Sequence, residues 1–302
     1  MTQIDSRAGV AYAASAYIIW GIIPFYWRLL AHVGALELTV HRVLWCAVAV
    51  AGMVFLRGRW PAVRGVFADR RLLATLALTS VLISINWGLY IWCVVSEQIV
   101  EASLGYYINP LVSITLGVVL LGERMSLQRK IAVGLAAVAV GVQTAAFGHF
   151  PAIALTLAFS FGLYGYYRKI ANIGALEGLL VETALLFPLT IGLVLYWGWQ
   201  GTGHFLVGAG WTDLLLIGAG PLTAIPLALF AAGARRIRLS TLGFLQYLAP
   251  SLMLILATVF FGEAFTWIHA ASFGCVWFAL ILIAVEGRAA RLTWTRRFPP
   301  AG

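Results

Sequence analysis

Four ionisable residues lie inside long apolar stretches of the chain, and their types suit ion coupling or binding. They are His41, Arg42, Glu101 and Glu182. A charge among apolar side chains is costly unless it is paired or faces a polar interior, so such residues are functional candidates by default. We therefore predict a coupling or gating role for these four, with snorkelling of the long side chains to a surface as the alternative.

The two oppositely charged members of this set occupy matching places in the two halves of the chain. Arg42 and Glu182 are 140 positions apart, but each lies near a different end of its apolar stretch, so they are not expected to pair. Closer partners are available in the sequence. They are Glu37 or Glu101 for Arg42, and Arg168 or Lys169 for Glu182.

Polar and aromatic residues recur at spacings of three or four, which places them on single faces of helices. Polar groups in lipid must find partners, so these faces turn inward. Hydrogen bonds between helices explain each face alone, whereas several faces together favour one shared polar and aromatic cavity. The candidate solute-binding residues are Trp20, Asn86, Tyr90, Tyr106, Tyr107, Asn109, Tyr164, Gln246 and Tyr247.

Two prolines, Pro110 and Pro250, lie near the middle of matching apolar runs. A proline inside a helix removes one backbone hydrogen bond and clashes with the preceding turn. We expect both helices to be interrupted or bent there and a solute to bind between them. The neighbouring amides, with no unpaired charge at that depth, predict a neutral or zwitterionic solute.

Several kinds of chemistry lack their usual sequence motif. The chain contains neither the G-x-x-x-x-G-K-S/T loop of nucleotide hydrolases nor the H-E-x-x-H motif of metalloproteases. The three cysteines are dispersed within apolar runs and have no metal or disulfide spacing. We therefore predict no catalytic residue, no metal site and no cofactor.

The composition places these residues in membrane-spanning helices. Hydrophobic residues make up 62% of the 302 and charged residues 10%, against about 45–50% and about 25% in soluble domains. Runs near the ~20 residues that cross a bilayer follow one another. The ten expected spans are about 9–28, 36–56, 72–95, 99–121, 129–147, 150–168, 176–198, 212–234, 239–261 and 267–286.

The basic residues predict the orientation of these spans. With a cytoplasmic N-terminus, the cytoplasmic segments hold all of the 20 lysines and arginines except Arg28 and Arg42. This bias favours both termini inside. The net charge of +9 is then a topology signal and a contact with lipid headgroups, and nucleic acid is not an expected partner because no loop supplies one contiguous basic patch.

The chain contains an internal repeat. Pro110, Gly122 and Glu123 recur as Pro250, Gly262 and Glu263 at an offset of 140, whereas the preceding Leu-Gly pair recurs at 138, so the second copy gains two residues just before its proline. Each unit has five spans, an odd number, so the second unit enters the membrane inverted. The predicted units are 8–147 and 148–287, followed by a basic cytoplasmic tail, 288–302.

Two smaller features leave alternatives open. Gly122 is expected to end its helix, and Glu123 to lie near the start of the next helix, where the dipole favours negative charge; a gating role is the alternative. Ala137, Gly141 and Ala145 form a small-residue ladder, for which we expect core packing rather than homodimerisation, although a homodimer remains possible.

Ordered motifs along nearly the whole chain resemble the RarD-type permeases of the drug/metabolite transporter superfamily, which have EamA-type repeats. The motifs are YIIWGIIPFYW at 17–27, HRVLW at 41–45, NW at 86–87, EASLGYYINPL at 101–111, GER at 122–124, AFSFGLYG at 158–165, GPLTAIPL at 220–227 and STLGFLQYLAP at 240–250. The resemblance implies ten helices in two inverted repeats, a central cavity and a bacterial cytoplasmic (inner) membrane. It links the family to chloramphenicol sensitivity and to export of amino acids and other metabolites.

These observations predict an all-α integral membrane protein of ten helices that acts as a secondary transporter. We expect it to export a small amphiphilic metabolite or drug by alternating access, with the solute and membrane lipid as its partners. The alternatives are an intramembrane enzyme, for which no nucleophile–base or metal constellation is present, and a non-transporting membrane scaffold.

Overall fold

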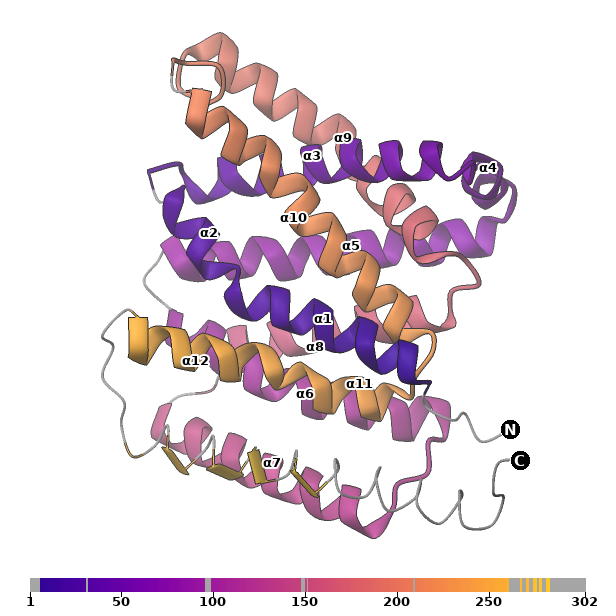
Figure 1. The fold of residues 1–302 in the computed structure, drawn as a ribbon, viewed down its shortest axis with the longest axis vertical. Coiled ribbons are helices and arrows are strands. Elements are labelled where there is room, and N and C mark those ends of the chain that lie inside the picture. Colours follow the sequence, from indigo (N-terminus) through magenta and orange to yellow (C-terminus); the bar gives the residue numbers. More distant parts are fainter. Residues whose placement is uncertain are drawn as a thin grey trace, which may run out of the picture.

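The computed structural model describes residues 6–30, 32–95, 99–147, 150, 152–208 and 210–260, together with separate residues between 267 and 282. All regular structure in these ranges is helical (Figure 1). The helices are α1 (Arg7–Ile22), α2 (Pro24–Leu29), α3 (Ala35–Leu56), α4 (Trp60–Ala68), α5 (Arg70–Val95), α6 (Ile99–Leu121), α7 (Leu127–Phe147), α8 (Ala152–Ile170), α9 (Ala175–Gln200), α10 (Gly210–Ala234), α11 (Leu239–Gln246) and α12 (Leu248–Phe260).

These helices account for nine of the ten expected spans within the described ranges. The first span is α1 with α2, and the ninth is α11 with α12; α3 and α5 to α10 supply one span each. The tenth falls mostly outside the described residues, and its described members, such as Trp267 and Cys275, are helical. The all-helical, ten-span fold class is therefore confirmed.

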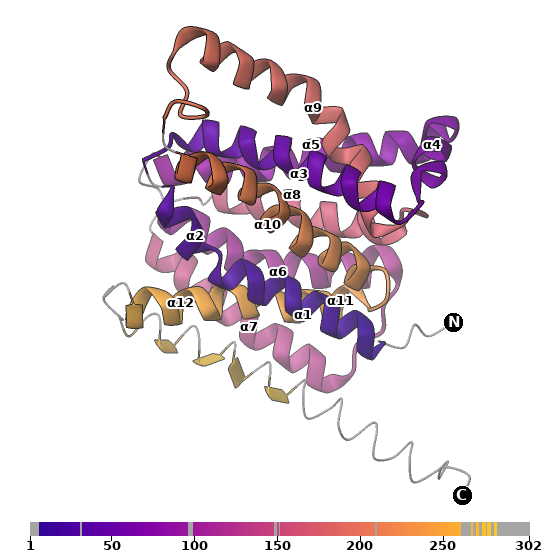
Figure 2. The same ribbon diagram turned by 45° about the horizontal axis from the view of Figure 1, so that its top comes forward.

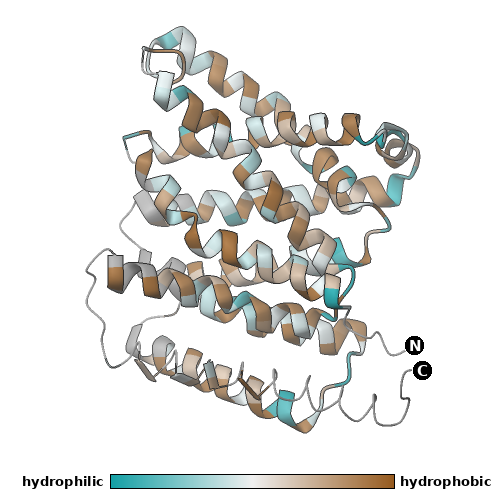
Figure 3. Ribbon diagram, viewed as in Figure 1, coloured by the Kyte–Doolittle hydropathy of each residue, from teal (hydrophilic) through white to brown (hydrophobic). Residues whose placement is uncertain are grey.

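The outer surface has the composition of a lipid-facing surface. Large apolar side chains are exposed on several helices, among them Leu56 and Trp199 at 84% each and Phe55 at 75%. In water such a surface would be an association or aggregation site, whereas in a bilayer it is the solvated state. Figure 3 shows hydrophobic residues along the lengths of the helices and hydrophilic ones gathered near helix ends and connections.

One helix was not among the predicted spans. Helix α4 is short and lies in a segment rich in arginine, with Arg59 before it and exposed Arg64 within it. Its Trp60 and Phe67 are exposed at 41% and 58%. Arginine with exposed aromatic side chains is typical of a helix that lies in the plane of the membrane interface.

Local sequence signals define several helix ends. Ser6 Oγ accepts a hydrogen bond from Gly9 N at 3.0 Å and caps α1. Gly122 has a φ of 62° and ends α6 as predicted. Gly201, with a φ of 68°, ends α9 in the same way.

The helices pack with an approximate two-fold symmetry that relates the two halves (Figures 1 and 2). Helix α10 packs on α3, and the equivalent helices of the other half, α5 and α9, pack on each other. In the same way α6 packs on α8, and their equivalents, α11 with α12 and α1, pack on each other. Equivalent helices are about 140 positions apart in the chain. The repeat in the sequence is therefore also a repeat in packing.

Equivalent helices run in opposite directions. The start of α1 and the end of α8 meet at the same connection, because Ser6 N donates to Arg236 O at 3.4 Å and Lys169 Nζ donates to Ala234 O at 3.1 Å. Likewise Arg59, which follows α3, forms an ion pair of 2.6 Å with Glu177 in the first turn of α9. This antiparallel relation is the inversion that an odd number of spans predicts.

The two proline helices differ. Helix α6 continues through Pro110, so the expected interruption of this helix is wrong. The ninth span is interrupted at Tyr247, three residues before Pro250. The second repeat has two additional residues in this place, since six residues separate Gly243 from Pro250 and four separate Gly105 from Pro110.

Helix α7 presents its small-residue ladder outward. Ala137, Gly141 and Ala145 are exposed, whereas Ala136 and Ala139 are buried. The expectation of core packing for the ladder is therefore wrong. Homodimerisation stays a prediction that these contacts do not test.

Candidate solute-binding site

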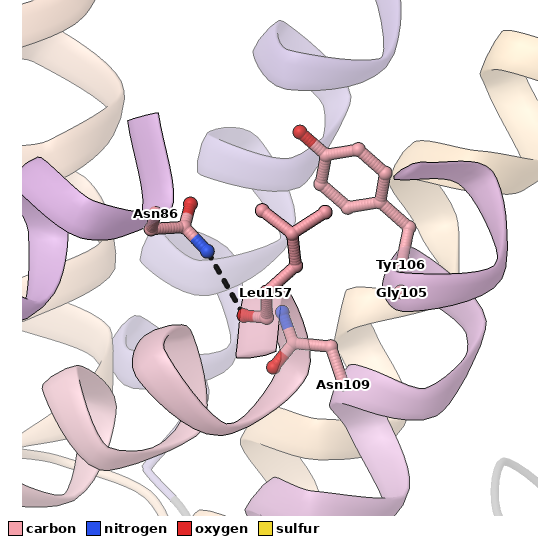
Figure 4. A pocket seen from close by; sticks show the side chains of 5 residues that line it. All are labelled: Asn86, Gly105, Tyr106, Asn109 and Leu157. Atoms are coloured by element: carbon pink, nitrogen blue, oxygen red, sulfur yellow. Dashed lines mark hydrogen bonds between the residues drawn. The ribbon is translucent and has the colours of Figure 1, made fainter. Parts of the chain in front are cut away.

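A small pocket lies where α5, α6 and α8 meet. Asn86 of α5, Gly105, Tyr106 and Asn109 of α6, and Leu157 of α8 line it (Figure 4). A Cβ on Gly105 would lie 3.1 Å from the Ala154 carbonyl oxygen, so glycine lets α8 approach α6 closely at this point. The enclosed cavity measures about 10 Å³, close to the minimum for one water molecule and far below the about 300–1,000 Å³ of ligand sites, so it would have to widen to admit a solute.

The two asparagines present different polar groups to this pocket. Asn86 is buried, and its Nδ2 donates to Leu157 O at 2.9 Å and to Ser160 Oγ at 3.1 Å. Asn109 is 6% exposed, and its Oδ1 has no hydrogen-bond partner within the described structure. A buried acceptor without a donor costs about 1–3 kcal/mol, so Asn109 has the property expected of a ligand-binding group.

Pro110 adds a backbone acceptor beside these side chains. Because proline has no N–H, the carbonyl of Tyr106, four residues earlier, loses its helical partner. Pro250 does not have this effect, because it lies in the first turn of α12, where backbone N–H groups have no helical partner.

The seam between the fourth and ninth spans is closely packed, which differs from the expected binding position. A Cβ on Gly243 of α11 would lie 2.8 Å from the Pro110 carbonyl oxygen of α6. The pocket therefore lies on the α5 and α8 side of α6. Gln246 instead accepts a hydrogen bond from Ser113 Oγ at 3.2 Å, and Tyr247 donates to Tyr107 O at 3.4 Å.

Two further candidates from the sequence belong to the aromatic core. Trp20 packs against Tyr17, Phe161 and Phe230 with ring centroids 5.5–5.8 Å apart. Tyr164 stacks on Phe230 at 5.9 Å and is fully buried. Neither residue lines the pocket.

Arg42 lies at the meeting point of the two repeats. Its guanidinium carbon is 4.6 Å from the ring centroid of Trp27 and 5.3 Å from that of Trp87. Its Nε donates to Thr223 Oγ1 at 3.3 Å. The prediction of Glu37 as its partner is wrong, since the Glu37 carboxylate is engaged by His204; the side chain of Glu101 lies outside the described residues.

Glu182 forms the local ion pair that was predicted. Its Oε1 lies 3.6 Å from Arg168 Nε, and both side chains are almost fully buried. Thr79 Oγ1 donates to the same carboxylate at 2.6 Å, and Tyr164 Oη donates at 3.4 Å. The network joins α5, α8 and α9, and it confirms that Arg42 and Glu182 do not pair with each other.

His41 belongs to a polar cluster at the opposite end of the helices from Glu182. Its Nε2 lies 4.0 Å from Glu37 Oε1, and Trp45 Nε1 donates to its Nδ1 at 3.3 Å. Glu37 also accepts from His204 N at 2.6 Å and contacts His204 Nδ1 at 2.8 Å. The carboxylate thereby ties the connection between α9 and α10 to the start of α3.

Glu123 caps a helix, but not the next one in the sequence. Its carboxylate accepts hydrogen bonds from Leu239 N at 2.6 Å, Ser240 N at 2.9 Å and Ser240 Oγ at 2.7 Å. These donors start α11, which belongs to the other repeat. Helix capping was predicted, whereas the identity of the capped helix depends on tertiary packing.

Sequence reasoning missed three groups around these sites. Trp27, Trp87 and Thr223 enclose Arg42, although each lies within a motif noted in the sequence. Their distances along the chain from Arg42 carry no signal of contact. Among the described residues, no group of three or more histidine, cysteine, aspartate or glutamate side chains is placed to hold a metal ion.

Helices that expose apolar side chains, repeat with inversion and enclose a small pocket with two asparagines define a polytopic membrane protein with transporter architecture. Residues 7–144 match the EamA-like transporter family. The chain is 45% identical to "Protein RarD" of Streptomyces exfoliatus, covering 97% of this chain and 93% of that protein. It is 41% identical to "Protein RarD" of Escherichia coli (strain K12), covering 95% and 97%.

A solved crystal structure shares the fold, with a TM-score of 0.70 and 18% identity over 94% of this chain and 100% of that chain. The chain belongs to the RarD-type permeases of the drug/metabolite transporter superfamily. It is a multi-pass membrane transporter whose relatives are bacterial proteins. The family and its relatives are described as transporters and permeases rather than enzymes.

Proposed function

We propose that this protein is a secondary active transporter that exports a small amphiphilic metabolite, amino-acid-like or chloramphenicol-like, by alternating access. The pocket beside Asn109 is the proposed solute site. Its membrane is the bacterial cytoplasmic membrane, and both termini lie in the cytoplasm.

The observation that carries this proposal is the unpartnered Asn109 Oδ1 at a pocket inside an inverted repeat. A buried polar atom without a protein partner indicates a missing water or ligand donor. Asn86, Tyr106 and the freed Tyr106 carbonyl add further polar groups around the same space. Transporters of this architecture bind solutes at the interface of the two repeats, and the pocket lies between α5 and α6 of the first repeat and α8 of the second.

The orientation is supported by the gathering of basic connections at one end of the bundle. Arg59, Lys169 and Arg236 all contact neighbours there, across elements from both repeats. Lysine and arginine accumulate on the cytoplasmic side of membrane proteins. In that orientation Glu182 lies nearer the cytoplasm, and His41 and Glu37 lie nearer the outside.

The proposal is tested by counterflow of labelled amino acids and chloramphenicol in liposomes that contain the purified protein. Asn109→Ala and Tyr106→Ala should each lower flux about tenfold, which corresponds to the loss of one hydrogen bond or aromatic contact of about 1.4 kcal/mol. Thr115→Ala is the matched control, because this α6 hydroxyl is exposed and bonds to its own helix at Leu111 O. Its flux should match that of the unmodified protein.

Different failures of this test have different meanings. Flux equal to that of empty liposomes for every solute would favour a non-transporting scaffold. Chemical conversion of a solute by the purified protein would favour an enzyme. Unchanged flux in both pocket variants, with solute counterflow intact, would place the solute elsewhere in the bundle.

A further inference from the structure

Arg42 places a positive charge inside the helix bundle. An arginine stays protonated in proteins, because its pKa lies far above neutral pH. Placing that charge at membrane depth is costly unless a partner offsets it. The residues that contact Arg42 therefore indicate what kind of group would balance its charge.

The described contacts of Arg42 hold its guanidinium but do not neutralise it. Trp27 and Trp87 supply the two ring contacts. Thr223 takes only the Nε–H. Arg42 forms no ion pair with a carboxylate among the described side chains, which do not include Glu101.

The two terminal nitrogens of this guanidinium have no hydrogen-bond partner among the described residues. Arg42 is only partly buried, and its one described hydrogen bond uses Nε. By contrast, Arg168 is fully buried and paired with Glu182. The two arginines thus differ, since Arg168 has a carboxylate partner and Arg42 has none among the described side chains.

The environment also fixes the geometry of the free donors. Ring contacts and the Thr223 bond hold the planar fork, so its two terminal nitrogens are preorganised for a bidentate acceptor. The contact of Arg42 with Trp87 connects this position to the pocket, since Trp87 follows Asn86 of the pocket lining. The expectation of a neutral or zwitterionic solute stays a prediction.

We propose that Arg42 binds the carboxylate of the transported solute, so that the substrate class is small organic carboxylates, including amino acids, rather than neutral or cationic compounds. The inference rests on the proposed transport function and narrows it. Arg42 would bind the carboxylate, and Asn86 and Asn109 would bind the remaining polar groups of the solute. Trp27, Trp87 and Tyr90 would give the carboxylate a dry, aromatic surrounding in which the ionic hydrogen bonds are strong.

The test uses arginine-specific labelling of the unmodified protein in lipid nanodiscs. Phenylglyoxal modification of Arg42 is followed by peptide mass spectrometry, with exposed Arg64 as the internal control. Phenylalanine and benzoate should slow the modification of Arg42 by about tenfold when present at ten times their Kd. Phenylalaninamide and benzamide should not, and Arg64 should react equally in all samples.

Thermal shift of variants provides the second measurement. Arg42→Gln should abolish stabilisation by the carboxylates, and Arg42→Lys should weaken it because the fork is lost while the charge remains. Arg64→Gln should behave like the unmodified protein. If Arg42→Gln fails to fold, the labelling experiment decides alone, since it needs no variant.

Each other outcome overturns the inference. Absence of Arg42 labelling, absence of protection, or equal protection by the amides would show that no carboxylate is recognised there. Protection by chloride or sulfate alone would assign an inorganic anion instead. If liposomes still move chloramphenicol while Arg42 is indifferent to carboxylates, the transport function stands and only the substrate class is wrong; liposomes without any flux would overturn the function itself.

Discussion

Replacing Glu123 by alanine tests whether the first repeat holds the start of α11 in the second. The carboxylate follows the glycine that ends α6 and accepts three hydrogen bonds from Leu239 and Ser240. The contact spans 116 and 117 positions in the chain. Its loss therefore affects both a helix cap and the joint between the repeats.

The expected destabilisation is about 2 kcal/mol. Removing an N-cap side chain costs about 0.5–2 kcal/mol, and loss of the negative charge from the helix N-terminus adds about 0.3–1 kcal/mol. Full charged hydrogen bonds would suggest more, about 1.5–3 kcal/mol each. Glu123 is only partly buried, however, and water replaces some of these bonds after the change.

The assay is equilibrium unfolding in mixed micelles, with Asp69→Ala as the matched control. Asp69 Oδ1 accepts from Arg71 N and Leu72 N, both at 3.0 Å, and caps an exposed helix start within its own segment. Its loss should cost about 1 kcal/mol. Glu123→Gln should lie between Glu123→Ala and the unmodified protein, because the amide keeps an acceptor but not the charge.

Two results would refute this reasoning. Equal stability of Glu123→Ala and the unmodified protein would mean that the carboxylate does not cap α11 in solution. A loss no greater than that of Asp69→Ala would mean that the joint between repeats contributes nothing beyond a local cap. A faster transport rate with unchanged stability would support the gating alternative in place of the structural one.

Three further predictions follow from the fold. A reporter active only outside the cytoplasm should give no signal when fused to Gly302, and a strong signal there would contradict the proposed orientation. Glu182→Gln should destabilise the protein by about 3–5 kcal/mol, because it leaves a buried Arg168 charge unpaired; adding Arg168→Gln should restore most of that loss in the same unfolding assay, and failure to do so would argue against the pair. Pro110→Ala should change the transport rate more than the melting temperature, since alanine restores a backbone hydrogen bond within α6, and Pro250→Ala, beside the break between α11 and α12, should do likewise; flux equal to that of the unmodified protein in both would reduce the prolines to packing features.

Much of the architecture follows from chain-local physics. Runs of apolar residues must become helices in a bilayer, because each backbone polar group needs a partner within its own segment. The glycine at position 122 ends α6 because its backbone adopts a positive φ. Because each repeat has an odd number of spans, the second repeat must be inverted. The ion pair between Arg59, which follows α3, and Glu177, at the start of α9, shows this inversion.

The pairing of Glu182 with Arg168 was also within reach of the sequence. The two residues lie near the same end of adjacent spans, so the connection between α8 and α9 brings them together. The interruption at Tyr247 was partly signalled, since the second repeat carries two additional residues before Pro250. The number of residues before each proline therefore predicted the helix break better than the prolines alone did.

Only the tertiary structure decided which polar faces share one space. Spacing along a helix places Asn109 and Tyr106 on one face. Which helices lie beside that face depends on close approaches at two glycines. Gly105 lets α8 approach α6, and Gly243 lets α11 approach α6. The tryptophans around Arg42 and the helix capped by Glu123 come from distant parts of the chain. A membrane helix has nearly the same local environment at many rotations, so its contacts are selected by close packing between helices rather than by its own sequence pattern.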